Sequence, residues 1–219
     1  MELVKRLYER APPSLQRPLR RAYVAYIRRR YARGGRRPRP GETSKARARR
    51  EEDGFFNRFC QGRGLDVGHG GDPVSPGCAE WDIEDGDAHL LAGVPNDAFD
   101  FVYSSHTLEH LENPALALRN WSRVLAPGGH LILFLPDRDL YEKKAHLPSR
   151  FNPDHKHFFL LDRDDPPDTL GVIPLVARVL PELEVVYTKV CNGGPPVNDP
   201  LQHSAGEYSI EVVLRKPAS

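Results

Sequence analysis

The fold of this chain is decided by residues 64–72, which read GLDVGHGGD. In this stretch a short apolar strand that carries one acid, Asp66, runs directly into a glycine-rich turn. Glycine adopts positive φ angles at little cost and lets the backbone approach a ligand with no Cβ atom in between. A strand that empties into such a turn is typical of α/β folds that bind a nucleotide at the carboxyl ends of a parallel sheet.

The residues around the turn distinguish between two kinds of nucleotide ligand. The dinucleotide fingerprint has a third glycine three residues after its second, and this chain has Pro73 there. Two carboxylates, Asp66 and Asp72, flank the turn, and they would repel a pyrophosphate. They suit a ligand that carries an ammonium and a sulfonium, such as S-adenosylmethionine. A glycine turn with a purely structural role is the alternative.

Two further motifs follow the turn at suitable distances. Residues 99–111 (FDFVYSSHTLEHL) read as a buried strand that ends in a loop, and residues 125–134 (LAPGGHLILF) as a helix end, a Pro-Gly-Gly turn and a buried strand. With these motifs the chain resembles the class I S-adenosylmethionine-dependent methyltransferases, in the type 11-like subgroup that has LEH after the fourth strand. The resemblance covers roughly residues 63–136. It implies a Rossmann-like, mostly parallel sheet with an antiparallel last strand and helices on both faces.

The expected cofactor contacts follow from the strand pattern and from the resemblance. Asp82 follows the expected second strand, where an acid can accept both ribose hydroxyls. By resemblance, Asp87 followed by the small residue Ala88 receives the adenine amino group. The connection after Asp72 is short, so the second helix and part of the second or third strand are expected to be reduced, and residues 82–87 could instead form a solvated acidic turn. The predicted cofactor residues are Asp66, Gly68, Gly70, Asp82, Asp87, Ala88 and Ser105.

Histidines after the fifth expected strand are candidates for the chemistry of the methyl acceptor. Residues 152–159 read NPDHKHFF and lie where relatives of the resembled family build their acceptor pocket. Histidine exchanges protons near neutral pH, so it suits a general base. His155 is the first choice, His157 the second, and His110 of the LEH motif the third. The alternative is that they are ordinary surface histidines.

Residues 106–110 read HTLEH and match the inverted zinc-protease pattern H-x-x-E-H. That motif needs a long host helix, whereas Asn113 and Pro114 begin a new helix here. Ubiquinone-biosynthesis O-methyltransferases have an acid-x-x-Glu-His at the matching place, which is thought to hold a divalent cation, and His106 replaces that acid in this chain. No metal ligand is therefore predicted, and the question stays open for His106, Glu109 and His110.

The charges divide the chain into two parts. Residues 1–50 hold 17 Lys and Arg against three acids, whereas the remainder holds 14 against 27. The sequence predicts a basic, partly helical arm and linker over residues 1–50 and a methyltransferase domain over residues 51–219. The arm could lie on anionic lipid, bind nucleic-acid phosphates or dock on its own acidic domain. A membrane or membrane-protein contact is favoured because Tyr23, Tyr26 and Ile27 share a helix face, and no specific nucleic acid is expected.

The three cysteines, Cys60, Cys78 and Cys191, show no C-x-x-C spacing, which argues against a disulfide framework and a zinc cluster. No apolar run reaches the roughly 18 residues of a membrane span, and no secretory signal is visible. The expected location is the cytoplasm, with peripheral contact at the inner membrane face through residues 1–50.

These features predict an enzyme that transfers a methyl group from S-adenosylmethionine to an oxygen or nitrogen of a small-molecule or saccharide acceptor. The alternative is a non-catalytic module with a cofactor fold that its basic arm recruits to a membrane assembly. Cofactor binding without methyl transfer would favour that alternative. The sequence does not name the acceptor.

Overall fold

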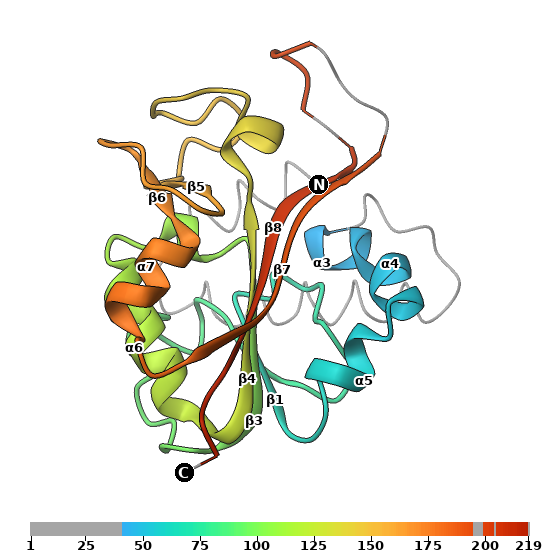
Figure 1. Cartoon of the computed structure of the whole chain (residues 1–219), viewed down its shortest axis with the longest axis vertical. Helices are drawn as coiled ribbons and strands as arrows, with labels where there is room; N and C mark the ends of the chain where they lie inside the picture. The colour runs from blue at the N-terminus through green and yellow to red at the C-terminus, as the bar shows by residue number, and fades with distance from the viewer. Residues whose placement is uncertain (1–40, 195–198, 204, 219) are drawn as a thin grey trace. The chain divides into compact units, whose positions relative to one another are not determined.

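The computed structural model describes residues 41–194, 199–203 and 205–218 (Figure 1). Most of the basic arm predicted for residues 1–50, including its expected helix, lies outside these residues. The second of the two units into which the chain divides begins at Gly41, and the fold described below is that of this unit. None of the described helices is long and apolar enough to cross a membrane.

A six-stranded sheet forms the centre of the unit, with the strands in the order β2-β1-β3-β4-β8-β7 (Figure 1). The pairs β1–β2, β1–β3 and β3–β4 are parallel, and β8 is antiparallel to both of its neighbours. This confirms the predicted mostly parallel sheet with an antiparallel last strand. The strands are β1 (Gly64–Val67), β2 (Ala79–Trp81), β3 (Phe99–Ser105), β4 (Leu125–Pro136), β7 (Glu184–Gly193) and β8 (Glu207–Arg215).

Helices cover both faces of the sheet, as predicted (Figure 1). On one face lie α6 (Pro114–Val124) and α7 (Val172–Val179). Asn113 caps α6 by accepting the Leu116 backbone N–H at 3.0 Å, and Pro114 begins the helix. Trp121 of α6 is fully buried in the core of this face. The other face carries the short helices α3 (Glu42–Lys45), α4 (Arg47–Glu52) and α5 (Phe55–Phe59).

The domain boundary predicted between residues 50 and 51 falls inside α4. Arg50 of this helix is fully buried, where its Nε donates to Glu211 of β8 at 2.7 Å and its Nη1 to the Tyr103 hydroxyl at 2.9 Å. In the sequence, the basic residues of α4 look like a continuation of the arm. Their acidic partners lie near the other end of the chain, so no local pattern shows that they are paired. Residues 41–50 thus pack with the sheet, in the unit that begins at Gly41.

The connection from β1 to β3 is reduced, as the short sequence after Asp72 predicts. No helix separates β1 from β2 in the structure, β2 has only three residues, and residues 82–98 form no strand. The irregular segment that follows β4 contains the π-helical turn η2 (Arg138–Glu142) and leads to a small parallel pair, β5 (Phe158–Leu160) and β6 (Thr169–Gly171). A 3-10 turn, η1 (Leu108–His110), follows β3.

Candidate active site

The carboxyl ends of three parallel strands carry the predicted site. Because β1, β3 and β4 run in the same direction, the segments that follow them meet at one edge of the sheet. The glycine turn follows β1, the LEH segment follows β3, and the histidine-rich segment follows β4. The order of these elements therefore brings together stretches that lie far apart in the sequence.

The glycine turn packs closely against the LEH segment. Gly68 has φ +77°, and a Cβ atom at this position would collide with the side chain of Thr107. Thr107 in turn lies within hydrogen-bond distance of two backbone carbonyls of the turn, that of Val67 at 3.3 Å among them. Asp72, the second acid of the turn, accepts the Ser44 backbone N–H at 2.8 Å and so anchors α3. Glycine is thus required at position 68 by both backbone conformation and space.

Two buried polar atoms beside this turn lack hydrogen-bond partners among the described residues. Asp66 accepts the Val74 backbone N–H at 2.7 Å through one carboxylate oxygen, while its Oδ1 has no partner. Burial raises the pKa of Asp66 to about 8. The hydroxyl of Ser105, at the end of β3, is also buried without a partner. Buried polar atoms usually find partners, so a polar ligand such as S-adenosylmethionine fits this turn.

The remaining predicted cofactor residues differ in their surroundings. Asp82 follows β2 and accepts the Gly70 backbone N–H at 3.1 Å, so it lies at the glycine turn, and its contact with the ribose stays a prediction. Asp87 accepts the backbone N–H of His89 at 2.8 Å, and this bond holds the pKa of its carboxyl below the usual range. The Ala88 carbonyl accepts the Trp121 indole N–H at 2.9 Å. The bond to Trp121 holds Ala88 against α6, whereas the bond between Asp87 and His89 stays within the segment.

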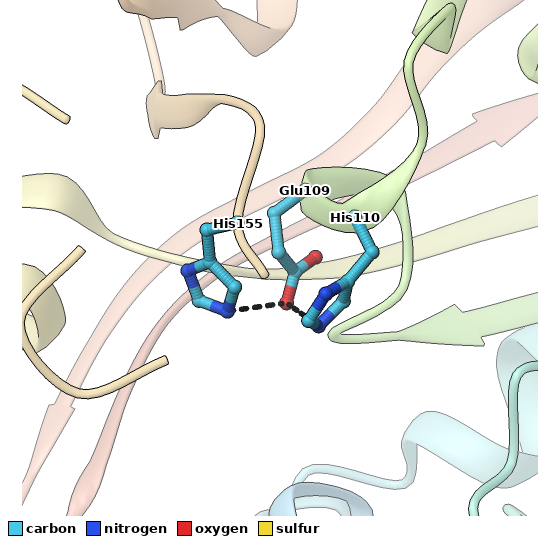
Figure 2. A group of neighbouring side chains, drawn as sticks. All are labelled: Glu109, His110 and His155. Carbon is cyan, nitrogen blue, oxygen red and sulfur yellow. Dashed lines mark ion pairs between the residues drawn. The ribbon is translucent and has the colours of Figure 1, made fainter. Parts of the chain in front are cut away.

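A second group of side chains lies where the LEH segment meets the histidine-rich segment (Figure 2). We call Glu109, His110 and His155 the Glu109 cluster. The Nε2 atoms of His110 and His155 lie 4.0 and 3.9 Å from the same carboxylate oxygen of Glu109. The Lys156 backbone N–H donates to the Glu109 carbonyl at 2.7 Å, so the two segments are also joined through their backbones.

His155 is not a surface histidine, because it is only 4% exposed. Its Nδ1 lies 2.6 Å from a carboxylate oxygen of Glu142, the last residue of η2, and the Ser149 hydroxyl bonds the other oxygen. A carboxylate at Nδ1 favours the tautomer with the proton on that nitrogen. The lone pair on Nε2 then faces Glu109, where it can accept a proton or bind a cation.

Glu109 is the most unusual residue of the cluster. It is fully buried, and neither carboxylate oxygen has a hydrogen-bond partner among the described residues. Burial raises its pKa well above the ordinary value, and the carboxylates of Glu142 and Glu42 act in the same direction. His106 faces Glu109 with its Nδ1 at 3.7 Å, while its Nε2 lies 2.9 Å from the Ser209 hydroxyl. Burial lowers the pKa of His106.

The structure therefore brings His155 and His110 together and gives His157 a different place. The backbone N–H of His157 bonds the Glu109 carbonyl at 3.3 Å, but its Nε2 is buried with no hydrogen-bond partner among the described residues. Sequence reasoning missed Glu142, because no motif marks it and it lies 13 residues before its partner His155. The sequence marks Glu109 only as part of the H-x-x-E-H pattern.

Comparisons with known proteins agree with the observed fold. Residues 46–133 match the family model described as "Methyltransferase domain". One similar solved structure carries the description "Conversion of a Disulfide Bond into a Thioacetal Group during Echinomycin Biosynthesis". It is 17% identical, the match covers 84% of this chain and 88% of that chain, and the TM-score is 0.52. A search among curated proteins found no match.

Two further solved structures are similar at lower TM-scores. The N-methyltransferase NodS from Bradyrhizobium japonicum is 16% identical, with coverage of 78% of this chain and 96% of that chain and a TM-score of 0.48. The [4+2]-cyclase SpnF is 16% identical, with coverage of 78% and 81% and a TM-score of 0.48. The family match over residues 46–133 and the sheet topology support a class I methyltransferase domain, and the match implies S-adenosylmethionine as its cofactor.

Proposed function

We propose that the chain transfers a methyl group from S-adenosylmethionine to an oxygen or nitrogen of a small-molecule or saccharide acceptor. The observation that carries this proposal is the Glu109 cluster, in which His155, held by Glu142, lies beside the LEH segment that contacts the cofactor turn. Thr107 contacts that turn, and Glu109 and His110 follow two and three residues later. Cofactor binding alone does not require the paired imidazoles of His110 and His155.

On the cofactor side, the proposed contacts are the turn residues and the acids near it. Asp66 and Ser105 supply buried polar atoms, Gly68 lets the backbone come close, and Asp82 lies at the turn. When bound, S-adenosylmethionine supplies a methyl group on a sulfonium sulfur, and an acceptor lone pair displaces the sulfur as a neutral thioether. The protein mainly holds the two reactants in line, since proximity and orientation supply most of the rate.

On the acceptor side, we assign the activating role to the Glu109 cluster, with His155 as its central residue. Glu142 holds the ring of His155 so that Nε2 faces the cluster. His110 is the most exposed member, with 32% of its side chain accessible, and it marks the side from which an acceptor enters. A hydroxyl acceptor loses its proton as the new C–O bond forms, so a group that favours the deprotonated oxygen speeds the reaction.

Labelled cofactor tests this proposal directly. The full chain is incubated with methyl-labelled S-adenosylmethionine and fractions of cell extract, and the label is followed into each fraction. We expect label in a small-molecule or saccharide fraction with the parent protein and strongly reduced label with His155→Ala. Calorimetric cofactor binding with no label transferred to any fraction would instead support the non-catalytic binding module.

A further inference from the structure

The carboxylate of Glu109 presents a problem that the methyltransferase fold alone does not explain. It is fully buried, it accepts no hydrogen bond from the described residues, and three imidazole nitrogens surround one of its oxygens at 3.7 to 4.0 Å. These distances are longer than hydrogen bonds. A buried carboxylate without partners is costly, and a proton or a cation can compensate that cost.

We propose that Glu109, His110 and His155 bind a divalent first-row transition-metal cation, for which Zn²⁺ is the best match. One donor atom from each of the three residues lies within 4.8 Å of the other two (Figure 2). Two imidazole nitrogens and one carboxylate oxygen form a donor set that zinc takes in catalytic sites, where a fourth position stays open.

The distances fit a cation after the cluster contracts, and the two imidazole nitrogens, which lie within 4.8 Å of each other, must approach by at most about 1.4 Å. Zinc binds imidazole nitrogen and carboxylate oxygen at about 2.0–2.2 Å, so tetrahedral donors lie about 3.4 Å apart. The two pairs that include Glu109 measure 3.9 and 4.0 Å, so each must shorten by only about half an ångström. His110 is partly exposed at the end of η1, and its ring is therefore the one that has room to move.

The surrounding residues already orient the proposed ligands. The carboxylate of Glu142 at Nδ1 of His155 leaves Nε2 as the coordinating atom, which is the usual arrangement around histidines that bind metals. The bond from the Lys156 backbone N–H to the Glu109 carbonyl fixes the two segments relative to each other. His106 faces the same Glu109 oxygen and is itself bonded to Ser209, so it is suited to hold the carboxylate in place.

The donor set of the cluster is a poor match for Mg²⁺. Mg²⁺ demands oxygen ligands in near-octahedral geometry, and this cluster offers one carboxylate and two nitrogens. The two buried carboxylates, Glu109 and Glu142, together carry the charge that a divalent cation neutralises. We therefore expect zinc and its analogues to bind far more tightly than magnesium.

The role of the cation rests on the proposed function, whereas its binding does not. An acceptor hydroxyl that binds the open position through its oxygen has a lowered pKa, so it releases its proton to solvent water before it attacks the methyl group. In that arrangement the Nε2 lone pair of His155 is a ligand and not the proton acceptor. Metal affinity, measured without any acceptor, tests the site independently of methyl transfer.

The experiment uses Co²⁺ as a spectroscopic analogue of Zn²⁺. The full chain is stripped with a chelator and titrated with Co²⁺, and the visible absorption of the protein-bound metal is recorded; Zn²⁺ affinity follows from competition. We expect tight binding of one ion per chain. His110→Ala and His155→Ala should weaken it more than 100-fold, and Glu142→Gln, which removes an orienting contact, about 10- to 100-fold. Mg²⁺ in millimolar excess should displace little of the Co²⁺.

His146→Ala is the matched control, because His146 lies in the same connection between β4 and β5 but is 64% exposed and faces Asp168. It should bind Co²⁺ as the parent does. Circular dichroism and calorimetric cofactor binding establish that each variant is folded, and the partly exposed His110 makes His110→Ala a safe variant if a buried substitution fails to fold. The proposal is overturned if the parent binds no Co²⁺, if His110→Ala retains parental affinity, or if Mg²⁺ competes on equal terms.

Discussion

The Nδ1 atom of His155 lies 2.6 Å from a carboxylate oxygen of Glu142, and both side chains are buried. A buried carboxylate that holds one nitrogen of an imidazole makes the other nitrogen the reactive one. The π-helical turn that ends at Glu142 places it beside the loop that carries His155. This pair is the reason to expect chemistry at the Glu109 cluster.

The first prediction concerns the loss of this imidazole. His155→Ala should lower the turnover of methyl transfer by about 10²- to 10⁴-fold, the usual contribution of a group that favours the deprotonated acceptor, because the variant lacks the imidazole in either role, as base or as metal ligand. Affinity for S-adenosylmethionine should stay within about threefold, since the proposed cofactor contacts belong to other segments. Steady-state kinetics and calorimetry measure the two quantities. Near-parental turnover in His155→Ala and His157→Ala, together with a loss in His110→Ala, would assign the role to the LEH segment.

The second prediction uses two glycines of the same turn. Gly68 and Gly71 both have positive φ, so an alanine at either position is strained by about 1–2 kcal/mol. Only at Gly68 does the added Cβ also meet Thr107, whereas open space surrounds Gly71. Gly68→Ala should therefore abolish calorimetric cofactor binding, and Gly71→Ala should weaken it much less. Equal effects of the two substitutions would show that the Thr107 side chain moves aside for the added Cβ atom without a loss of cofactor affinity.

The third prediction follows from the raised pKa of Asp66, which burial shifts from 3.8 to about 8. Between these values the folded chain binds a proton that the unfolded chain has released, so the free energy of unfolding falls as the pH rises from about 4 to about 8. Asp66→Asn keeps an acceptor for the Val74 N–H but has no proton to lose. Urea unfolding at pH 5 and pH 8 should show a smaller pH-dependent loss in the variant, by an amount on the order of a few kcal/mol.

Glu109 also has a raised pKa and contributes to the same pH dependence in both proteins. The comparison therefore depends on the difference between parent and variant, and not on either curve alone. Identical slopes of stability against pH would mean that Asp66 is ionised in the folded protein at neutral pH.

The fourth prediction concerns the buried ion pair of Arg50 and Glu211. Arg50→Ala should lower the free energy of unfolding by about 3 kcal/mol, the lower end of the usual range for a broken buried pair, because the Glu211 carboxylate loses one cation but keeps Arg49 at 2.8 Å. The exposed pair of Arg215 and Glu184 is the control, and Arg215→Ala should cost less than about 1 kcal/mol. Denaturant unfolding measures both. If removal of residues 1–50 had no more effect on stability than removal of residues 1–40, helix α4 would be dispensable.

The fifth prediction addresses the basic arm. Removal of residues 1–40 should leave cofactor affinity nearly unchanged, because the proposed cofactor contacts all lie in the unit that begins at Gly41. We propose that the full chain binds anionic vesicles and that the shortened chain does not. Vesicle binding should weaken with salt, since exposed charges are screened beyond about 10 Å at 0.1 M. Sedimentation with anionic and neutral vesicles checks this, and vesicle binding that survives the truncation would exclude the arm as the contact.

Much of the fold could be read from the sequence because its signals are local. The glycine turn after Asp66, the cap of α6 at Asn113 and the last two β-branched strands each depend on a few neighbouring residues and their intrinsic backbone preferences. The short connection after Asp72 likewise predicts that no helix separates β1 from β2.

The sequence by itself therefore determined the sheet, its helices and the position of the cofactor turn. The tertiary structure alone decided which charged side chains are buried and what they face. Arg50 reads as one more basic residue of an arm until β8 brings Glu211 to it, and Glu142 carries no motif that points to His155. The physical reason is that burial and electrostatic pairing depend on contacts between segments distant in sequence, which local patterns do not encode.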